Sequence, residues 1–224
     1  MTILCIETST SVCSAAICKD GVPIKQCICL EGSNHARLLP RYIEELLSFA
    51  REQHLSIDAV ALSEGPGSYT GLRIGTSTAK GICYGLNIPL IPVPTLEILC
   101  EAAKSQISNH QSSILIPMID ARRMEIYTQI NGETRAVVVE NEDSLYSGDE
   151  EVYYFGDGAE KCAKIFTKPN WHYIPNIVPE ACFVGKMAEM TNHQLPITNQ
   201  RLAYYEPYYL KEFVATQSHV KGLH

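Results

Sequence analysis

The chain has 224 residues, of which 46% are apolar and 19% are charged, and this is the composition of a folded protein with a sizeable core. Its formal net charge of -7 argues against a broad electrostatic grip on nucleic acid, so any work on RNA would need another molecule to hold the RNA. No apolar run approaches the roughly 18 residues that cross a membrane, and the start MTILCIETS lacks the basic region of a signal peptide. These features predict a cytoplasmic protein that makes no membrane contact.

The chain contains nine cysteines, and no two of them form a CxxC pair. Those of the N-terminal region lie in apolar or alternating segments, where a thiol behaves as a small hydrophobe. They are Cys5, Cys13, Cys18, Cys27 and Cys29. In a cytoplasmic protein this pattern predicts buried, reduced thiols.

Three short runs rich in β-branched and apolar residues open the chain, over residues 2–9, 11–21 and 22–32. The sequence Lys19-Asp20-Gly21 is a tight-turn signal between the second run and the third. The three runs therefore predict an antiparallel meander.

A helix is expected next, over residues 33–53. Its apolar side chains recur at helical spacing, at Leu39, Ile43, Leu46, Leu47 and Ala50. Pro40 either sits in the first turn of this helix or kinks it.

The pattern then alternates between strands and helices. We expect a strand over 57–65, a glycine-rich turn and helix over 63–81, a strand over 87–93 and a helix over 94–107. Near residue 112 an apolar run again ends at an acidic residue and a turn, as the first strand does. This predicts two lobes with a related beginning, an N-terminal lobe over 1–110 and a shortened C-terminal lobe over 111–224, whose last segment can pack back on the first.

The second lobe is predicted to be leaner than the first. It would hold a hairpin over 122–140, a strand over 151–158, a short helix from Ala159 and a helix over 179–193, before a tail over 204–213 with four tyrosines.

The glycine-rich stretch SEGPGSYTGLRIGTSTAKG, residues 63–81, fails both common nucleotide-binding patterns, because neither GxxxxGK[ST] nor GxGxxG can be placed on it. Gly71, Gly75 and Ala79 recur every four residues and so lie along one side of a helix that Ser68 would cap. Small residues on one side let a second helix come close. That second helix is either the one around 39–50 of this chain or a helix of another chain.

Three turns, each of which on its own reads as an ordinary strand-end loop, are Glu7-Thr8-Ser9, Asp120-Ala121-Arg122 and Gly156-Asp157-Gly158-Ala159. Together they match the phosphate and adenosine loops of actin-like ATPases and sugar kinases. Metal chemistry is poorly supported, because only the distal His219 and His224 are three to five residues apart, and no GxSxG motif indicates a nucleophile.

The segments ILCIETST, SNHARLLP, EGPGSYTGLRIGTSTAKG, IDARRMEIY and PYYLKEF together resemble the TsaB family, also called YeaZ-like, over essentially the whole chain. This resemblance implies an α/β, two-lobed actin-like fold of the ASKHA and ribonuclease H-like class, with mixed sheets and a reduced C-terminal lobe. It also implies a role in making N6-threonylcarbamoyladenosine (t6A) beside the anticodon of tRNA.

The resemblance further implies that the chain is not an enzyme. In the TsaB family the protein is a degenerate relative of the transferase TsaD and lacks its HxxxH metal pair. It binds TsaD, and TsaE joins the pair, so that threonylcarbamoyl passes from threonylcarbamoyl-AMP to the tRNA. ATP or ADP and metal are then expected on TsaD and TsaE, with no cofactor on this subunit. The isolated chain is expected to form a homodimer, and tRNA is contacted mainly through the complex.

The family's pairing surface lies on the two N-lobe helices, here residues 35–50 and 69–84. The predicted interface residues are His35, Leu38, Leu39, Tyr42, Ile43, Leu46, Tyr69, Leu72, Arg73, Gly75, Thr76, Ala79, Lys80 and Cys83. A remnant nucleotide cleft is predicted at Glu7, Thr8, Ser9, Asp120, Gly156, Asp157 and Gly158. Glu7 departs from the aspartate common in the ATPases, and its extra methylene weakens the case for metal-nucleotide chemistry there.

The alternative function is a stand-alone actin-like ATPase or small-molecule kinase. ATP hydrolysis by the purified chain that is lost on Glu7→Ala would favour this alternative. Proteolysis of a partner is a third hypothesis, but no nucleophile and base can be named for it.

Overall fold

The computed structural model describes residues 1–224 except 31, 33, 109, 191–195 and 212–224. The first lobe is built from β1 (Thr2–Glu7), β2 (Cys13–Lys19), β3 (Val22–Cys29), α1 (His35–Glu52), β4 (Ala59–Gly65), α2 (Tyr69–Leu86), β5 (Leu90–Pro94) and α3 (Thr95–Lys104). After the short η1 (His110–Ser112) follow β6 (Ile114–Asp120), β7 (Glu125–Ile130), β8 (Glu133–Val138), η2 (Glu142–Ser144), β9 (Val152–Phe155), α4 (Ala159–Cys162), β10 (Trp171–Ile174), α5 (Ala181–Met190) and α6 (Asn199–Leu202).

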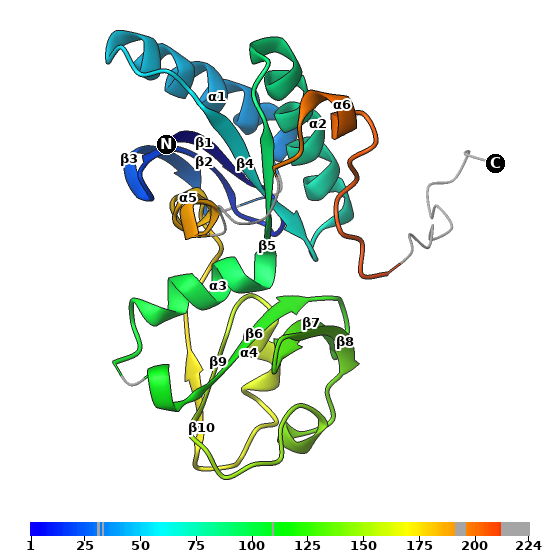
Figure 1. The fold of residues 1–224 in the computed structure, drawn as a ribbon. Helices are drawn as coiled ribbons and strands as arrows, with labels where there is room; N and C mark the ends of the chain where they lie inside the picture. Colours follow the sequence, from blue (N-terminus) through cyan, green and yellow to red (C-terminus); the bar gives the residue numbers. More distant parts are fainter. Residues whose placement is uncertain (31, 33, 109, 191–195, 212–224) are drawn as a thin grey trace, which may run out of the picture.

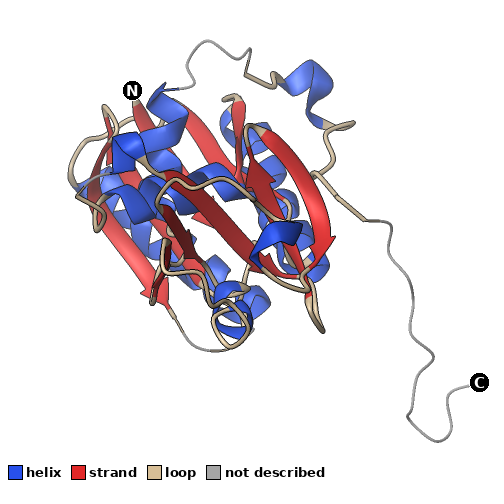
Figure 2. Ribbon diagram, turned by 90° about the horizontal axis from the view of Figure 1, so that it is seen from below, coloured by secondary structure: helices blue, strands red, loops and turns tan. Residues whose placement is uncertain are grey.

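Two five-stranded mixed sheets organise these elements, in the strand orders β3-β2-β1-β4-β5 and β10-β9-β6-β7-β8 (Figure 1). The view in Figure 2 shows helices on both sides of the strands. The prediction of an α/β fold with mixed sheets is confirmed. Among the described residues, no helix is both long and apolar enough to cross a membrane.

The predicted N-terminal meander is confirmed. β1 pairs antiparallel with β2, which pairs antiparallel with β3, while β4 and β5 add parallel strands on the other side of β1. Asp20 and Gly21 both have positive φ, 52° and 75°, which is the backbone of a two-residue hairpin turn.

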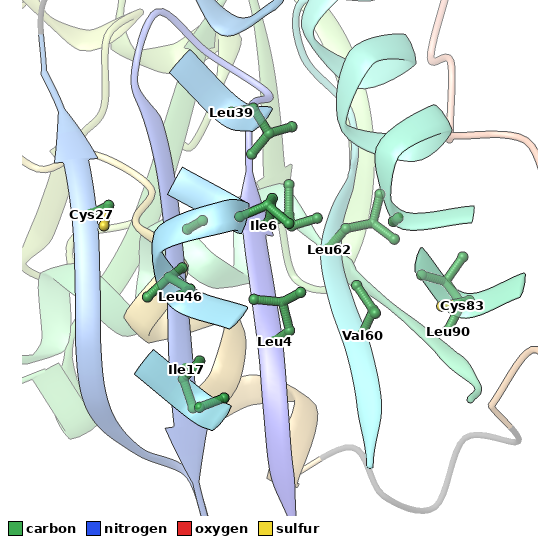
Figure 3. Close-up of a cluster of buried hydrophobic side chains, with 14 of the residues drawn as sticks. Leu4, Ile6, Ile17, Cys27, Leu39, Leu46, Val60, Leu62, Cys83 and Leu90 are labelled. Atoms are coloured by element: carbon green, nitrogen blue, oxygen red, sulfur yellow. The ribbon is translucent and has the colours of Figure 1, made fainter. Parts of the chain in front are cut away.

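Helices α1 and α2 cover one face of the first sheet. The core beneath them joins Leu39 and Leu46 of α1 to Leu4, Ile6 and other strand residues, as Figure 3 shows. These α1 side chains repeat every three to four residues, so a single stripe of the helix is buried. Pro40 lies in the second turn of α1, beyond the first-turn position that tolerates proline freely, and the helix continues past it.

Helix α5 follows the second sheet in the chain but packs on the other face of the first. Val184 and Ala188 of α5 share a core with Ile3 and Cys5 of β1, and the Ala181 N–H donates to Ser14 Oγ at 2.9 Å. Within the predicted helix over 179–193, residues 191–193 lie outside the described part of the chain. The strands of the first sheet all precede residue 110, and those of the second sheet all follow it. Helix α5, although it comes after the second sheet in the chain, packs on the first.

The second sheet has its own core, centred on Ile116, Ile126, Tyr154 and Trp171. The predicted hairpin is the antiparallel pair β7 and β8, and the predicted strand over 151–158 contains β9, which lies parallel to β6. Helix α3 joins the lobes, because Leu96 and Leu99 of α3 pack with residues of β6 and β9.

Candidate functional site: the helix pair and the cleft between the lobes

The glycine-rich turn places α2 directly over the end of β1. The Ser68 N–H donates to Ser9 O at 2.6 Å, and Ser68 Oγ accepts from the Gly71 N–H at 3.3 Å, which confirms Ser68 as the N-cap. A Cβ on Gly67 would lie 2.3 Å from Ser9 O. Only glycine lets the turn and the loop after β1 approach this closely.

The stripe of small residues on α2 faces this same loop. A Cβ on Gly71 would lie 2.0 Å from Thr8 O, and a Cβ on Gly75 would lie 2.3 Å from Thr8 Oγ1. Thr8 Oγ1 in turn donates to Gly71 O at 2.8 Å. For Gly71 and Gly75 the interpretation of the stripe as a helix-helix contact is therefore wrong, because their neighbour is the loop after β1. Ala79, the third residue of the stripe, does share a core with Leu39 and Leu46 of α1.

The structure changes the account of the predicted interface residues. Nine of the fourteen are buried inside the first lobe, where no partner can reach them: His35, Leu39, Ile43, Leu46, Leu72, Gly75, Thr76, Ala79 and Cys83. They belong to the stripes of α1 and α2 that face the sheet. Helical periodicity identified the apolar stripes, but in an amphipathic helix those stripes first serve the helix's own core.

The other five residues keep some exposure but lie on two different flanks. Tyr42 lies on the β3 side of α1, since its hydroxyl is close to Cys27 and Cys29. Leu38 is four residues before Tyr42 and so shares that flank. On α2, Tyr69, Arg73 and Lys80 face the C-terminal tail.

The tyrosine-rich tail lies along α2 and returns to the start of the glycine-rich turn. Lys80 Nζ donates to Ala203 O at 2.9 Å and to Tyr205 O at 3.0 Å. The Tyr208 N–H donates to Glu64 O at 2.7 Å, and the rings of Tyr69 and Tyr209 have centroids 4.6 Å apart. The sequence does not predict which residues this tail contacts, and its residues 212 and 213 lie outside the described part of the chain.

The outward side of α2 carries a second set of small residues, Ser77, Gly81 and Gly85, beside the large Tyr84, and we call these four residues the outer ridge. All four are exposed, and Tyr84 is 78% exposed. A Cβ on Gly81 or Gly85 would meet nothing within 4 Å. Sequence reasoning missed this ridge, although Ser77, Gly81 and Gly85 show the same four-residue spacing as the stripe that it chose.

A cleft of about 640 Å³ lies between the two lobes. Of the predicted remnant residues, Ser9, Asp120 and Asp157 line it, and the Asp120 N–H donates to Asp157 Oδ1 at 2.9 Å. Gly156 and Gly158 instead back against β6, where a Cβ on Gly156 would lie 2.2 Å from Met118 O. The tail also lines the cleft, through Tyr209, Leu210 and Lys211, and nothing in the local sequence indicated this.

Glu7 is fully buried at the end of β1 and does not line the cleft. Its Oε1 accepts from the Ser9 N–H at 2.6 Å and from Ser9 Oγ at 2.5 Å, whereas its Oε2 has no hydrogen-bond partner among the described residues. Burial raises the pKa of Glu7 to about 7, against the hydrogen bonds from Ser9 and the influence of the nearby Ser63 hydroxyl, which lower it. This carboxyl group is thus held inward, and Thr8 beside it faces α2.

Within the described part of the chain, no three His, Cys, Asp or Glu side chains are grouped as a metal would require. His35, one of the predicted interface residues, is buried at the start of α1 with its Nε2 3.1 Å from Val12 O. His193, His219 and His224 lie outside the described residues.

Comparison with known proteins gives consistent matches. A family model for TsaD, tRNA N6-adenosine threonylcarbamoyltransferase, matches residues 30–212. Among curated relatives, the tRNA threonylcarbamoyladenosine biosynthesis protein TsaB of Haemophilus influenzae is 34% identical over 127 residues, which is 57% of this chain and 52% of that protein. TsaB of Escherichia coli is 33% identical over 127 residues, 57% of this chain and 53% of that protein. The chain thus spans about half the length of the curated relatives it matches.

Solved structures agree on the fold. YeaZ from Pseudomonas aeruginosa superposes with a TM-score of 0.70 at 25% identity, covering 93% of this chain and 99% of that one. A second P. aeruginosa protein, described as similar to peptidase YeaZ, gives a TM-score of 0.71 at 23% identity, covering 94% and 99%. By the family model, the relatives and the fold together, the chain belongs to the TsaD family and, within it, to the TsaB or YeaZ-like branch.

Proposed function

We propose that this chain is a non-catalytic subunit in the synthesis of t6A in tRNA and that it acts by binding TsaD through the outer ridge of α2. Its curated relatives are named for tRNA threonylcarbamoyladenosine biosynthesis. TsaE would join the pair, and the isolated chain would form a homodimer through the same ridge. The formal charge of -7 supports a complex in which tRNA is contacted mainly through the assembled subunits and not by this chain alone.

The observation that carries this proposal is the open space over Gly81 and Gly85. An exposed glycine inside a helix costs about 1 kcal/mol relative to alanine, and no contact within the described chain explains either of them. Small residues at four-residue spacing let another helix approach the backbone closely. The exposed Tyr84 beside them is a residue type enriched at interfaces.

The two flanks of α2 support the same assignment. Ile74 and Ile82 are half-buried and pack on the first-lobe core, and they lie on the flank of α2 opposite to Tyr69 and Lys80, which contact the tail. The tail therefore covers one flank and the core fixes the other. The outer ridge, which passes beside Ile74, is left as the accessible strip of this helix.

We assign no catalytic residue to this chain. The carboxyl group that actin-like enzymes would present to a nucleotide is Glu7, and here it is buried and bonded to Ser9. Tail residues Tyr209 and Lys211 line the cleft in front of it. This arrangement supports placing ATP or ADP, metal and the transfer chemistry on TsaD and TsaE.

Replacing Gly81 with arginine should abolish pairing without unfolding the chain. The new side chain projects into open space in the monomer, whereas at a close helix-helix contact it would clash and bring an unpaired charge. We expect binding to TsaD to weaken about 100-fold or more, because a residue near the centre of an interface typically costs several kcal/mol. Titration calorimetry and size-exclusion chromatography measure this, with the thermal midpoint as the check on folding.

The matched control is Glu133→Arg, on the exposed start of β8 in the second lobe. This control makes a larger charge change far from the ridge and should leave TsaD binding intact. Unchanged affinity in the Gly81 variant, or equal loss in both variants, would count against the ridge as the pairing surface.

A further inference from the structure

Three thiols gather on the face of β2 and β3 that is covered by α1. The strand register places Cys13 directly opposite Cys29 and Ala15 directly opposite Cys27. Cys13 and Cys27 belong to the core under α1, and the hydroxyl of Tyr42 lies close to all three thiols, which add to the effect of burial in raising its pKa. None of the three forms a disulfide within the described part of the chain.

The register places Cys13 and Cys29 near the spacing that a disulfide needs. Side chains directly opposite on antiparallel strands point to the same face with Cβ atoms about 4.5–5.5 Å apart, close to the 3.5–4.5 Å found in disulfides. Cys5 and Cys18 also lie near each other, but the register pairs Cys5 with Ala16, so these two are diagonal and their backbones are farther apart. In the registers of the described strands, no other two cysteines face each other directly.

The two thiols differ in access. β3 is an edge strand of the first sheet, and Cys29, at its end, is partly exposed. Cys13 is fully buried, and burial raises its pKa to about 11. An oxidant from solvent therefore meets Cys29 first, and Cys13 is placed to react with whatever forms there.

We propose that Cys13 and Cys29 are a redox-active pair that hydrogen peroxide converts to a cross-strand disulfide. The sulfur of Cys29 attacks one peroxide oxygen, the O–O bond breaks, and a sulfenic acid and one water form. The sulfur of Cys13 then displaces the sulfenic hydroxyl as a second water, and the S–S bond closes. Two thiols and one peroxide thus give one disulfide and two waters.

The site lies next to the anchor of α1. The residue before Cys13 is Val12, whose carbonyl is 3.1 Å from His35 Nε2 in the first turn of α1. The disulfide would tie the start of β2 to the end of β3 at this point. This inference rests on the strand register and on the exposure of the two thiols, and it holds whether or not the chain binds TsaD.

The test uses the full, reduced chain. It is treated with hydrogen peroxide, the remaining thiols are alkylated, and the intact mass and peptide map are read. We expect two fewer alkylated thiols, a cross-linked peptide pair containing Cys13 and Cys29, and full reversal by dithiothreitol. Cys29→Ser should abolish the link, whereas Cys27→Ser, two residues along the same face, should leave it in place.

Sulfinic acid on Cys29 without a link would overturn the proposal. So would a link from Cys29 to any cysteine other than Cys13. The peptide map of the peroxide-treated parent chain, without any substitution, already decides between these results. The test therefore does not depend on how well the variants fold.

Discussion

Replacing Gly71 with alanine should lower the free energy of unfolding by about 3 kcal/mol, since overpacking against rigid neighbours costs this much. The new Cβ would lie 2.0 Å from Thr8 O, which is backbone and cannot rotate away. The loop itself is held by the bonds from Thr8 Oγ1 to Gly71 O and from the Ser68 N–H to Ser9 O. Urea unfolding followed by circular dichroism measures the change.

Gly81→Ala is the matched control for this prediction. It makes the same chemical change in the same helix, but its Cβ meets nothing within 4 Å. Alanine should therefore raise the free energy of unfolding by up to about 1 kcal/mol, through helix propensity alone. A Gly71 variant as stable as the Gly81 variant would show that α2 does not pack on the loop after β1.

Glu7 should make the folded state less stable as the pH rises. Its pKa is about 7 in the folded chain and 4.5 in the unfolded chain, so the folded state binds more protons between these values. Below pH 4.5 both states are protonated and Glu7 has no effect. As the pH rises from 4.5 to about 7, the free energy of unfolding falls by about 3 kcal/mol, because each unit of pKa difference contributes about 1.4 kcal/mol. Above pH 7 this loss no longer grows.

Glu7→Gln isolates this contribution, because other carboxyl groups titrate in the same range. An amide keeps the shape and still accepts from Ser9, but it cannot ionise. The variant should be close to the parent chain in stability near pH 4.5 and more stable by about 3 kcal/mol near pH 8. Unfolding curves at four or five pH values measure the difference, and two parallel curves would contradict the burial of an unpaired Oε2.

The strands and helices of the first lobe follow from local patterns. The turn at Asp20 and Gly21, the stripe from Leu39 to Ala50 and the cap at Ser68 each depend on neighbours a few residues away. Such features obey the periods of two and 3.6 residues, so the sequence predicts them.

The direction in which each side of a helix faces depends on contacts distant in the chain. The spacing of Gly71 and Gly75 shows that they share a side of α2, but Thr8, which fills that side, is more than 60 residues earlier. Gly81 and Gly85 have the same four-residue spacing, and only the folded structure shows which of the two glycine pairs is open.

The cleft illustrates the same limit. Ser9, Asp120 and Asp157 could be predicted to converge, because all three follow strand ends at a known kind of turn. The return of the tail could not, since Tyr208 reaches Glu64 through backbone atoms and Lys80 binds backbone carbonyls. Backbone groups carry no sequence signal of their partner.

The central claim is that this chain supports t6A synthesis through its pairing with TsaD. The most direct measurement is t6A formation on tRNA in a mixture of TsaD, TsaE and threonylcarbamoyl-AMP, with and without this chain. We predict that t6A forms with the parent chain and with Glu133→Arg, and that it falls to the level without the chain when Gly81→Arg replaces it. Equal t6A formation in the presence and absence of the chain would contradict the account.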